Sequence, residues 1–157
     1  MADDIKAKSA GLEGDPIEFA VMTEIGIINQ LADNLFQSHL PKGMTVAQFS
    51  VLNHLLRLDV QETISELASA MQVAQPTMSS TVRKLEDKGL VELIHDPNDR
   101  RIRRVAVTAS GTQCRNDAVA ALVPIAQIFR QNFAETEWEA LLPPLNRIRV
   151  FLDKLRS

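Results

Sequence analysis

The sequence has little of several residue types that specialised functions require. It contains a single cysteine, Cys114, and no tyrosine, and aromatic residues make up only 4% of its 157 positions. A single cysteine excludes an intrachain disulfide and any metal site built from several cysteines. The low aromatic content argues against a single-strand nucleic-acid platform, because such platforms stack bases on aromatic rings.

Long apolar runs are also missing. No segment approaches the roughly 18 consecutive apolar residues of a membrane-spanning helix, and the polar N-terminus lacks an apolar signal core. We therefore expect a cytoplasmic protein with no membrane partner. The three histidines, His39, His54 and His95, share no metal-ligand spacing with one another or with nearby carboxylates. No nucleophile and base form a recognisable pair, so the sequence predicts no metal, no cofactor and no enzymatic activity.

What is present is typical of one globular domain, with 45% hydrophobic and 24% charged residues and a net charge of -3. The charge is unevenly distributed along the chain. Residues 72–108 hold seven Lys or Arg and five acids, whereas the remainder holds ten basic and fifteen acidic residues. Four of the arginines lie between Arg100 and Arg104, which raises the local potential well above what the net charge suggests.

The N-terminal part is expected to contain a leader and one long helix. Residues 1–14 are polar and aperiodic, which predicts a disordered leader. The pattern of a helix start follows, with Asp15 as cap, Pro16 in the first turn and Glu18 as capping-box acid. Apolar residues then recur at helical spacing to about His39. Gly26 lies inside this helix and indicates close packing at that point.

Two further capping boxes, Thr45 with Gln48 and Thr63 with Glu66, predict two shorter helices. Another helix is expected to start at Pro76 and to end at the pair Lys88–Gly89. Two short helices joined by a tight turn form a helix-turn-helix pattern, although ordinary helical hairpins share this spacing.

The helix that starts at Pro76 has two distinct faces. Met78, Val82 and Leu85 recur at helical spacing and should point into the core. The opposite face carries short, hydrogen-bonding and mildly basic side chains: Gln75, Thr77, Ser79, Ser80, Arg83 and Lys84. Such side chains can reach base edges and phosphates when a helix enters the major groove. The alternative interpretation is a solvated helix face.

The spacing of apolar residues changes after Gly89 from that of a helix to that of a strand. Leu90 to Ile94 and Arg101 to Thr108 have the alternation of strands, and the turn between them is rich in Asp, Pro and Asn. Val105 and Val107 should face the core, while the arginines cluster near the tip. A helix-turn-helix followed by a basic hairpin is a winged helix, and a narrow minor groove attracts inserted arginine. A solvated basic surface is the alternative.

The C-terminal part is predicted to be helical throughout. A long helix should begin after Thr108, with a kink at Pro124. Thr136 with Glu139 makes a fourth capping box, and an apolar pattern continues almost to the end. The pair Pro143–Pro144 lies inside this pattern and predicts a bend or two short helices in place of one rod.

Four motifs between Met44 and Gly111 occur in a fixed order. They are T-x-x-Q-F-x-V-L, T-I-x-E-L-A, T-M-S-S-x-V-x-x-L-E-x-K-G-L-V, and D-R-R followed by V-x-V-T-x-x-G. In order and spacing the segment resembles the DNA-binding region of the MarR family of bacterial transcriptional regulators. The resemblance implies a mostly helical fold with a small β-hairpin wing, in which a winged helix-turn-helix domain is joined to a dimerisation region of terminal helices. The implied parts are a dimerisation helix at 15–40, the DNA-binding domain at 41–108 and dimerisation helices at 109–157.

The same resemblance implies a homodimer that binds pseudo-palindromic double-stranded DNA, as a repressor more often than as an activator. Such regulators are often released by a small aromatic or other organic ligand, or by oxidation. The resemblance places Thr77, Ser79, Ser80 and Arg83 on the recognition helix and Asp99 and Arg101 on the wing. We add as candidate DNA-binding residues Gln75, Pro76 and Lys84 of the same helix and Arg100 and Arg103 of the wing. An acid two residues before Arg101 can hold its guanidinium in one orientation.

A ligand pocket would lie between the first helix, the second helix and the helix after Thr108. By position alone its candidates are Phe36, Phe49, His54 and Leu55, although plain core is the alternative for these residues. Two other functions remain open: a winged-helix protein-interaction scaffold without specific DNA binding, and a thiol-based redox sensor acting through Cys114. The apolar helical stripe around Cys114 favours an inert core position.

Overall fold

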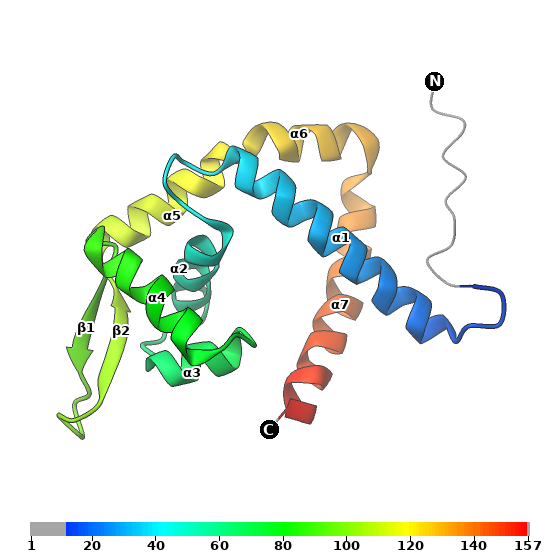
Figure 1. The fold of residues 1–157 in the computed structure, drawn as a ribbon. Helices are drawn as coiled ribbons and strands as arrows, with labels where there is room; N and C mark the ends of the chain where they lie inside the picture. The colour runs from blue at the N-terminus through cyan, green and yellow to red at the C-terminus, as the bar shows by residue number, and fades with distance from the viewer. Residues whose placement is uncertain (1–11, 157) are drawn as a thin grey trace. The chain divides into compact units, whose positions relative to one another are not determined.

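A computed structural model describes residues 12–156, and in this part of the chain it contains seven helices and one two-stranded antiparallel sheet (Figure 1). The chain divides into two units, Met1–Ala118 and Val119–Ser157. Of the predicted leader, residues 1–11 lie outside the described part, and Leu12 begins a turn in which the Asp15 amide donates to its carbonyl at 3.0 Å. None of the helices within residues 12–156 is both long and apolar enough to cross a bilayer.

Helix α1 (Ile17–His39) starts one residue later than its sequence pattern predicts. Pro16, with φ -57° and ψ 139°, is the N-cap residue, and Asp15 instead accepts a hydrogen bond from the Leu12 amide at 2.8 Å. The prediction of Asp15 as cap is therefore wrong, because the extended Pro16 separates it from the helix. The close packing predicted at Gly26 is also absent among the described residues, since a Cβ there would meet no atom within 4 Å.

Helix α2 (Val46–Leu58) precedes the helix-turn-helix, which consists of α3 (Ile64–Ala70) and α4 (Gln75–Asp87). Both predicted capping boxes are confirmed. The Thr45 hydroxyl accepts from the Gln48 amide at 3.2 Å, and the Thr63 hydroxyl accepts from the Glu66 amide at 3.1 Å. Helix α4 ends before Gly89, whose φ of 69° lies in the left-handed region that favours glycine.

The wing is a hairpin of β1 (Val91–His95) and β2 (Arg103–Val107), with Leu93 paired to Val105. The hairpin is confirmed, but β2 begins two residues later than predicted because Arg101 belongs to the loop. An isolated bridge pairs Glu62 with Val105, whose amide donates to the Glu62 carbonyl at 2.7 Å. The wing is thus hydrogen-bonded to the segment that precedes α3.

The core of the first unit lies among α2, α3, α4 and the hairpin. The predicted core residues Met78, Val82 and Leu85 are buried, and Val105 is fully buried, while Val107 is only partly so. Helix α5 (Ala109–Ala121) packs against this core through Cys114 and Ala118. The described members of the core cluster include Met44, Val51, Leu52, Leu55, Leu67, Ala68 and Val91.

The second unit contains α6 (Val123–Asn132) and α7 (Glu135–Arg156). The single long helix predicted to kink at Pro124 is instead two helices, α5 and α6. Pro124 lies in the first turn of α6, where its missing amide breaks no hydrogen bond within the helix. The predicted box of Thr136 with Glu139 is also wrong: α7 begins at Glu135, and Glu137 accepts from the Ala134 amide at 2.7 Å.

Helix α7 is one helix of 22 residues with Pro143 and Pro144 in its interior, so the predicted division into two short helices is wrong. Its first turns contact the end of α6 through aromatic rings. The Trp138 ring meets the rings of Phe129 and Phe133 edge to face, each at a centroid distance of 5.6 Å.

Candidate nucleic-acid interface

Helix α4 presents its predicted recognition face outward. Met78, Val82 and Leu85 turn the opposite side into the core. Six of the seven predicted residues are exposed and Ser79 is half-buried; the exposed ones are Gln75, Pro76, Thr77, Ser80, Arg83 and Lys84. Within residues 12–156 none of their side chains has a hydrogen-bond or ion-pair partner, so this face is free to meet a ligand.

The start of α4 also offers backbone donors. The N-cap residue Ala74 has no side-chain oxygen, and no side chain caps the helix. The amide groups at a helix start have no partner within the helix and favour anions such as phosphate. This end of α4 thus combines unpartnered amides with the polar side chains Gln75 and Thr77.

The wing tip holds one arginine in a fixed, exposed orientation. Arg101 donates from its backbone amide and from Nε to Asp99 Oδ1, each at 3.0 Å, and from Nη2 to Asp99 Oδ2 at 2.9 Å. This contact holds the pKa of the Asp99 carboxyl below its usual value. The Arg101 side chain nevertheless remains 90% exposed. The geometry that the sequence predicted for this pair is therefore present.

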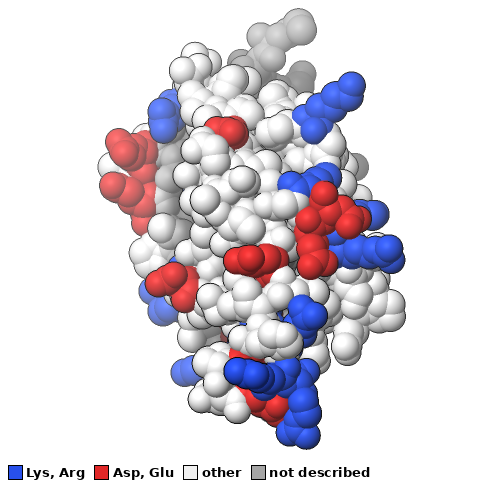
Figure 2. Space-filling view, turned by 90° about the vertical axis from the view of Figure 1, so that its left-hand side faces the viewer, with Lys and Arg blue, Asp and Glu red and all other residues white. Residues whose placement is uncertain are grey.

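The other predicted wing arginines differ in their contacts. Arg100 is exposed, and its side chain has no partner among residues 12–156, while its carbonyl accepts from His95 Nδ1 at 2.7 Å. Arg103 donates from Nη1 to the Leu93 carbonyl at 3.3 Å and remains exposed. Figure 2 views the molecule from the left-hand side of Figure 1 and shows basic side chains gathered at its lower end, with acidic side chains among them. Figure 1 places the hairpin tip at this end.

Asp96 and Arg104 form a contact that the sequence analysis missed. The Asp96 side chain is 9% exposed and accepts from the amides of Asn98 at 2.8 Å and Asp99 at 3.1 Å, and from Arg104 Nε. The Arg104 hydrogen bond, with the two amides, holds the pKa of Asp96 below its usual value. The run Asp96-Pro97-Asn98 is itself a signal for an Asp-initiated turn, which would have indicated the two amide contacts.

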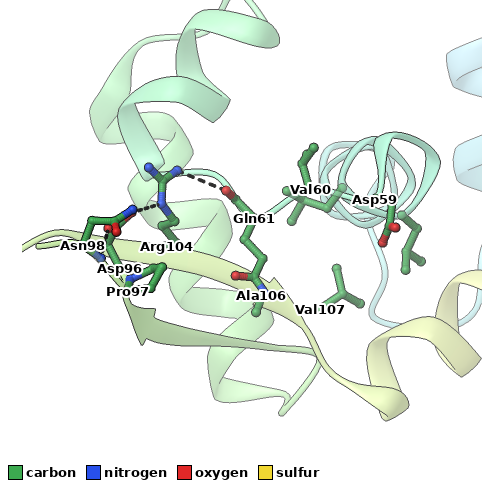
Figure 3. Close-up of a pocket in the computed structure, with 11 residues that line it drawn as sticks. Asp59, Val60, Gln61, Asp96, Pro97, Asn98, Arg104, Ala106 and Val107 are labelled. Carbon is green, nitrogen blue, oxygen red and sulfur yellow. Dashed lines mark hydrogen bonds and ion pairs between the residues drawn. The ribbon is translucent and has the colours of Figure 1, made fainter. Parts of the chain in front are cut away.

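A cavity of about 580 Å³ lies between the end of α2 and the hairpin (Figure 3). Of the four predicted ligand-pocket residues, Leu55 lines this cavity, whereas Phe36, Phe49 and His54 do not. Phe49 packs against the core, and His54 Nε2 lies 3.0 Å from Glu62 Oε2. The remaining lining residues are Leu56, Asp59, Val60, Gln61, Asp96, Pro97, Asn98, Arg104, Ala106 and Val107.

Cys114 and the absence of a metal-binding cluster among the described residues bear on the other functions considered from the sequence. Cys114 is half-buried and packs against the core cluster. No group of three or more His, Cys, Asp or Glu side chains in the described part of the chain is arranged to hold a metal ion.

Comparison with known proteins identifies this arrangement. The model of the MarR family matches residues 42–102, which run from the turn before α2 to the wing loop. The transcriptional regulator BldR from Sulfolobus solfataricus is 30% identical with a TM-score of 0.72, and the match covers 85% of this chain and 94% of BldR. This chain belongs to the MarR family.

Two other solved structures are similar over most of this chain. The C80S mutant of MarR from E. coli, complexed with operator DNA, is 28% identical with a TM-score of 0.64, over 79% of this chain and 89% of that one. BpsR from Bordetella bronchiseptica, whose DNA binding is regulated by 6-hydroxynicotinic acid, is 25% identical with a TM-score of 0.66, over 82% and 98% of the two chains. The predicted fold, a winged helix within a mostly helical chain, is confirmed. As a MarR-family member the protein is a DNA-binding transcriptional regulator and not an enzyme.

Proposed function

We propose that this protein represses transcription in the cytoplasm as a homodimer on a pseudo-palindromic operator. In this proposal α4 lies in the major groove and the wing tip reaches the adjacent minor groove. The observation that carries it is the outward face of α4, with its unpartnered Gln75, Thr77 and Ser80, together with Arg101, which Asp99 holds at the wing tip. Short polar side chains suit base edges, and an exposed arginine suits the negative potential of a narrow minor groove.

The homodimer is supported by apolar side chains left exposed on two helices. In α1, Ile28 is 60% and Leu31 is 64% exposed, and in α7 Leu142 and Leu155 are each 68% exposed. Neither helix buries these residues within its own unit. Exposed apolar stripes of this extent mark association surfaces, and a two-fold dimer is the commonest way to cover them.

Release by a small organic ligand is a further part of the proposal. It is supported by the likeness to BpsR, which responds to 6-hydroxynicotinic acid. We propose the region around Phe36, Phe49, His54 and Leu55 as the ligand site, as the sequence analysis predicts.

The decisive experiment is a binding titration with duplex DNA from beside the protein's own gene, against a scrambled duplex of equal length. We expect tight binding to the first duplex only, with an affinity that falls steeply with salt as counterions leave the phosphates. Weak binding to both duplexes, with no sequence preference, would instead favour the protein-interaction scaffold.

A further inference from the structure

The four arginines of the wing do not share one role. The Arg101 side chain is 90% exposed at the tip, whereas the Arg104 side chain is only 26% exposed and turns toward the body of the domain. Arg104 Nε donates to Asp96, and Arg104 Nη1 donates to the Gln61 carbonyl at 3.1 Å and to Glu66 Oε2 at 3.0 Å. Figure 3 shows the Arg104 guanidinium between Asp96 and Gln61.

These contacts join the wing to the first helix of the helix-turn-helix. Glu66 Oε2 also accepts from the Thr63 amide at 2.7 Å, so one carboxylate both caps α3 and holds Arg104. The Thr63 hydrogen bond is the main reason that the pKa of Glu66 lies below its usual value, and Arg104 lowers it further. The backbone bond between Val105 and Glu62 lies beside this cluster.

The same contacts continue to the wing tip. Asp96 holds the backbone amide of Asp99 at 3.1 Å, and the Asp99 carboxylate holds the Arg101 guanidinium. A continuous series of hydrogen bonds therefore runs from the cap of α3, through Arg104 and Asp96, to the arginine that projects from the tip.

We propose that Asp96, Arg104 and Glu66 form a clamp that fixes the wing on the helix-turn-helix, so that Arg104 acts on DNA through Arg101 and not by direct contact. The proposal rests on the proposed function, in which Arg101 enters the minor groove. Arg104 is then a positioning residue. Its guanidinium is suited to this role because its planar fork meets several acceptors at once, which a lysine ammonium cannot do in the same geometry.

If the clamp exists, neutralising its acids should change DNA affinity in the direction opposite to that expected from charge alone. Asp96 and Glu66 are acidic groups near a surface that would meet phosphates, so their neutralisation should strengthen DNA binding if only charge mattered. If they position the wing, the change Asp96→Asn or Glu66→Gln should weaken binding instead. Glu92→Gln is the matched control, because Glu92 is an exposed acid on β1 whose side chain has no partner among the described residues.

The experiment measures the dissociation constant of each full-length variant for a duplex selected from a random library by the wild-type protein. We expect Asp96→Asn and Arg104→Lys to weaken binding by about tenfold, and Glu92→Gln to leave it unchanged or stronger. Arg104→Lys keeps the charge, so a residue that merely contacts phosphate would lose little by this change. Circular dichroism and thermal unfolding identify any variant that fails to fold, and Arg104→Lys then provides the decisive comparison.

A double-mutant cycle with Arg101→Ala separates positioning from contact. If Arg104 acts through Arg101, Arg104→Lys should cost nothing further once Arg101 is alanine. Additive losses, or Asp96→Asn binding as tightly as wild type, would overturn the clamp while leaving the proposed function intact. Failure of the library selection to yield any preferred duplex would instead overturn the proposed function.

Discussion

Gly111 is the residue at which the fold leaves least room for a side chain. A Cβ at this position in α5 would lie 2.0 Å from the Leu90 carbonyl oxygen and 2.7 Å from Val107 Cγ1. The backbone of α5 therefore passes the residue before β1 and the end of β2 at a distance that only glycine allows. The clash cannot be relieved by a side-chain rotation because the Leu90 oxygen belongs to the backbone, and the Thr108 amide, which donates to it at 3.1 Å, opposes a shift of that backbone.

We expect Gly111→Ala to lower the free energy of unfolding by about 1–3 kcal/mol or more, since overpacking forces the backbone to shift. Urea unfolding followed by circular dichroism measures this change. Ser110→Ala is the control, because Ser110 is exposed in the same helical turn. Equal midpoints for the two variants would show that the crossing is looser than described.

Cys114 is predicted not to be the regulatory switch. It is half-buried against the core, and the chain has no second cysteine to resolve a sulfenic acid. Cys114→Ser should bind operator DNA with wild-type affinity and show only a modest loss of stability, because a hydroxyl replaces a thiol at an apolar site. Binding titrations before and after mild peroxide treatment provide the measurement.

Two copies of Cys114 in a dimer are the remaining route to a redox response. Non-reducing electrophoresis after mild oxidation tests it. A covalent dimer with lost DNA binding in wild type, and neither effect in Cys114→Ser, would make the protein a thiol sensor.

The local capping patterns were correct at Thr45 and Thr63 but wrong at Asp15 and Thr136, and contacts across the fold were not predicted. The boxes at Thr45 and Thr63 were found because both partners of each lie three residues apart in the chain. The contact between Asp96 and Arg104 depends on the hairpin register, which pairs His95 with Arg103, and the contact with Glu66 spans 38 positions. The spacing of these residues along the sequence does not indicate that they are in contact.

At the scale of the element, α4 and the wing should contribute differently to DNA recognition. Arg101→Ala should weaken binding to many sequences alike, because a wing tip that meets groove potential and phosphates carries little base information. Ser79→Ala and Arg83→Ala should instead change the preference among operator variants by about 1–3 kcal/mol at particular base pairs. Competition binding with single-base operator variants measures both effects. Equal losses on every sequence for all three changes would contradict the assignment of α4 as the recognition helix.

The wing should also loosen in acid. The pKa of Asp96 is lowered mainly by Arg104, and that of Asp99 mainly by Arg101, so both carboxylates are stabilised in their charged form by the folded wing. Their contribution to stability is complete above the unfolded pKa, near pH 4, and is lost as pH falls through the lower folded values. The free energy of unfolding should therefore decrease below about pH 4, and less steeply in Asp96→Asn than in wild type. If the free energy of unfolding fell equally with pH in the two proteins between about pH 5 and pH 3, the charged form of Asp96 would not stabilise the fold.

Element boundaries were predicted well where a local signal ends a helix and poorly where prolines are present. Gly89 ends α4 as expected, because its positive φ stops the helix. Pro124 starts α6 in place of kinking it, whereas Pro143 and Pro144 lie inside α7. A proline is compatible with a first turn or a distorted interior, and packing that the sequence does not specify decides between them.

At the scale of the whole molecule, the four motifs between Met44 and Gly111 were sufficient to identify the family, because each sits on an element whose order the fold preserves. The terminal helices were recognised by their apolar periodicity, since the caps predicted for them were wrong. That periodicity predicts buried faces, yet α1 has no buried residue in the described chain. The apolar stripes therefore require a partner for their burial.

We predict that this partner is a second copy and that the dimer is obligate. Exposed apolar side chains such as Leu31 in α1 and Leu142 in α7 would otherwise remain in contact with water, at a cost of about 25 cal/mol for each Å². Sedimentation equilibrium at micromolar concentration should give a mass of twice 17.4 kDa, and thermal unfolding should shift to higher temperature as concentration rises. Leu142→Glu should weaken association, whereas Glu139→Gln, an exposed change on the same helix, should not. A folded monomer at micromolar concentration would remove the dimer, and with it two recognition helices spaced about one DNA turn, ~34 Å, apart.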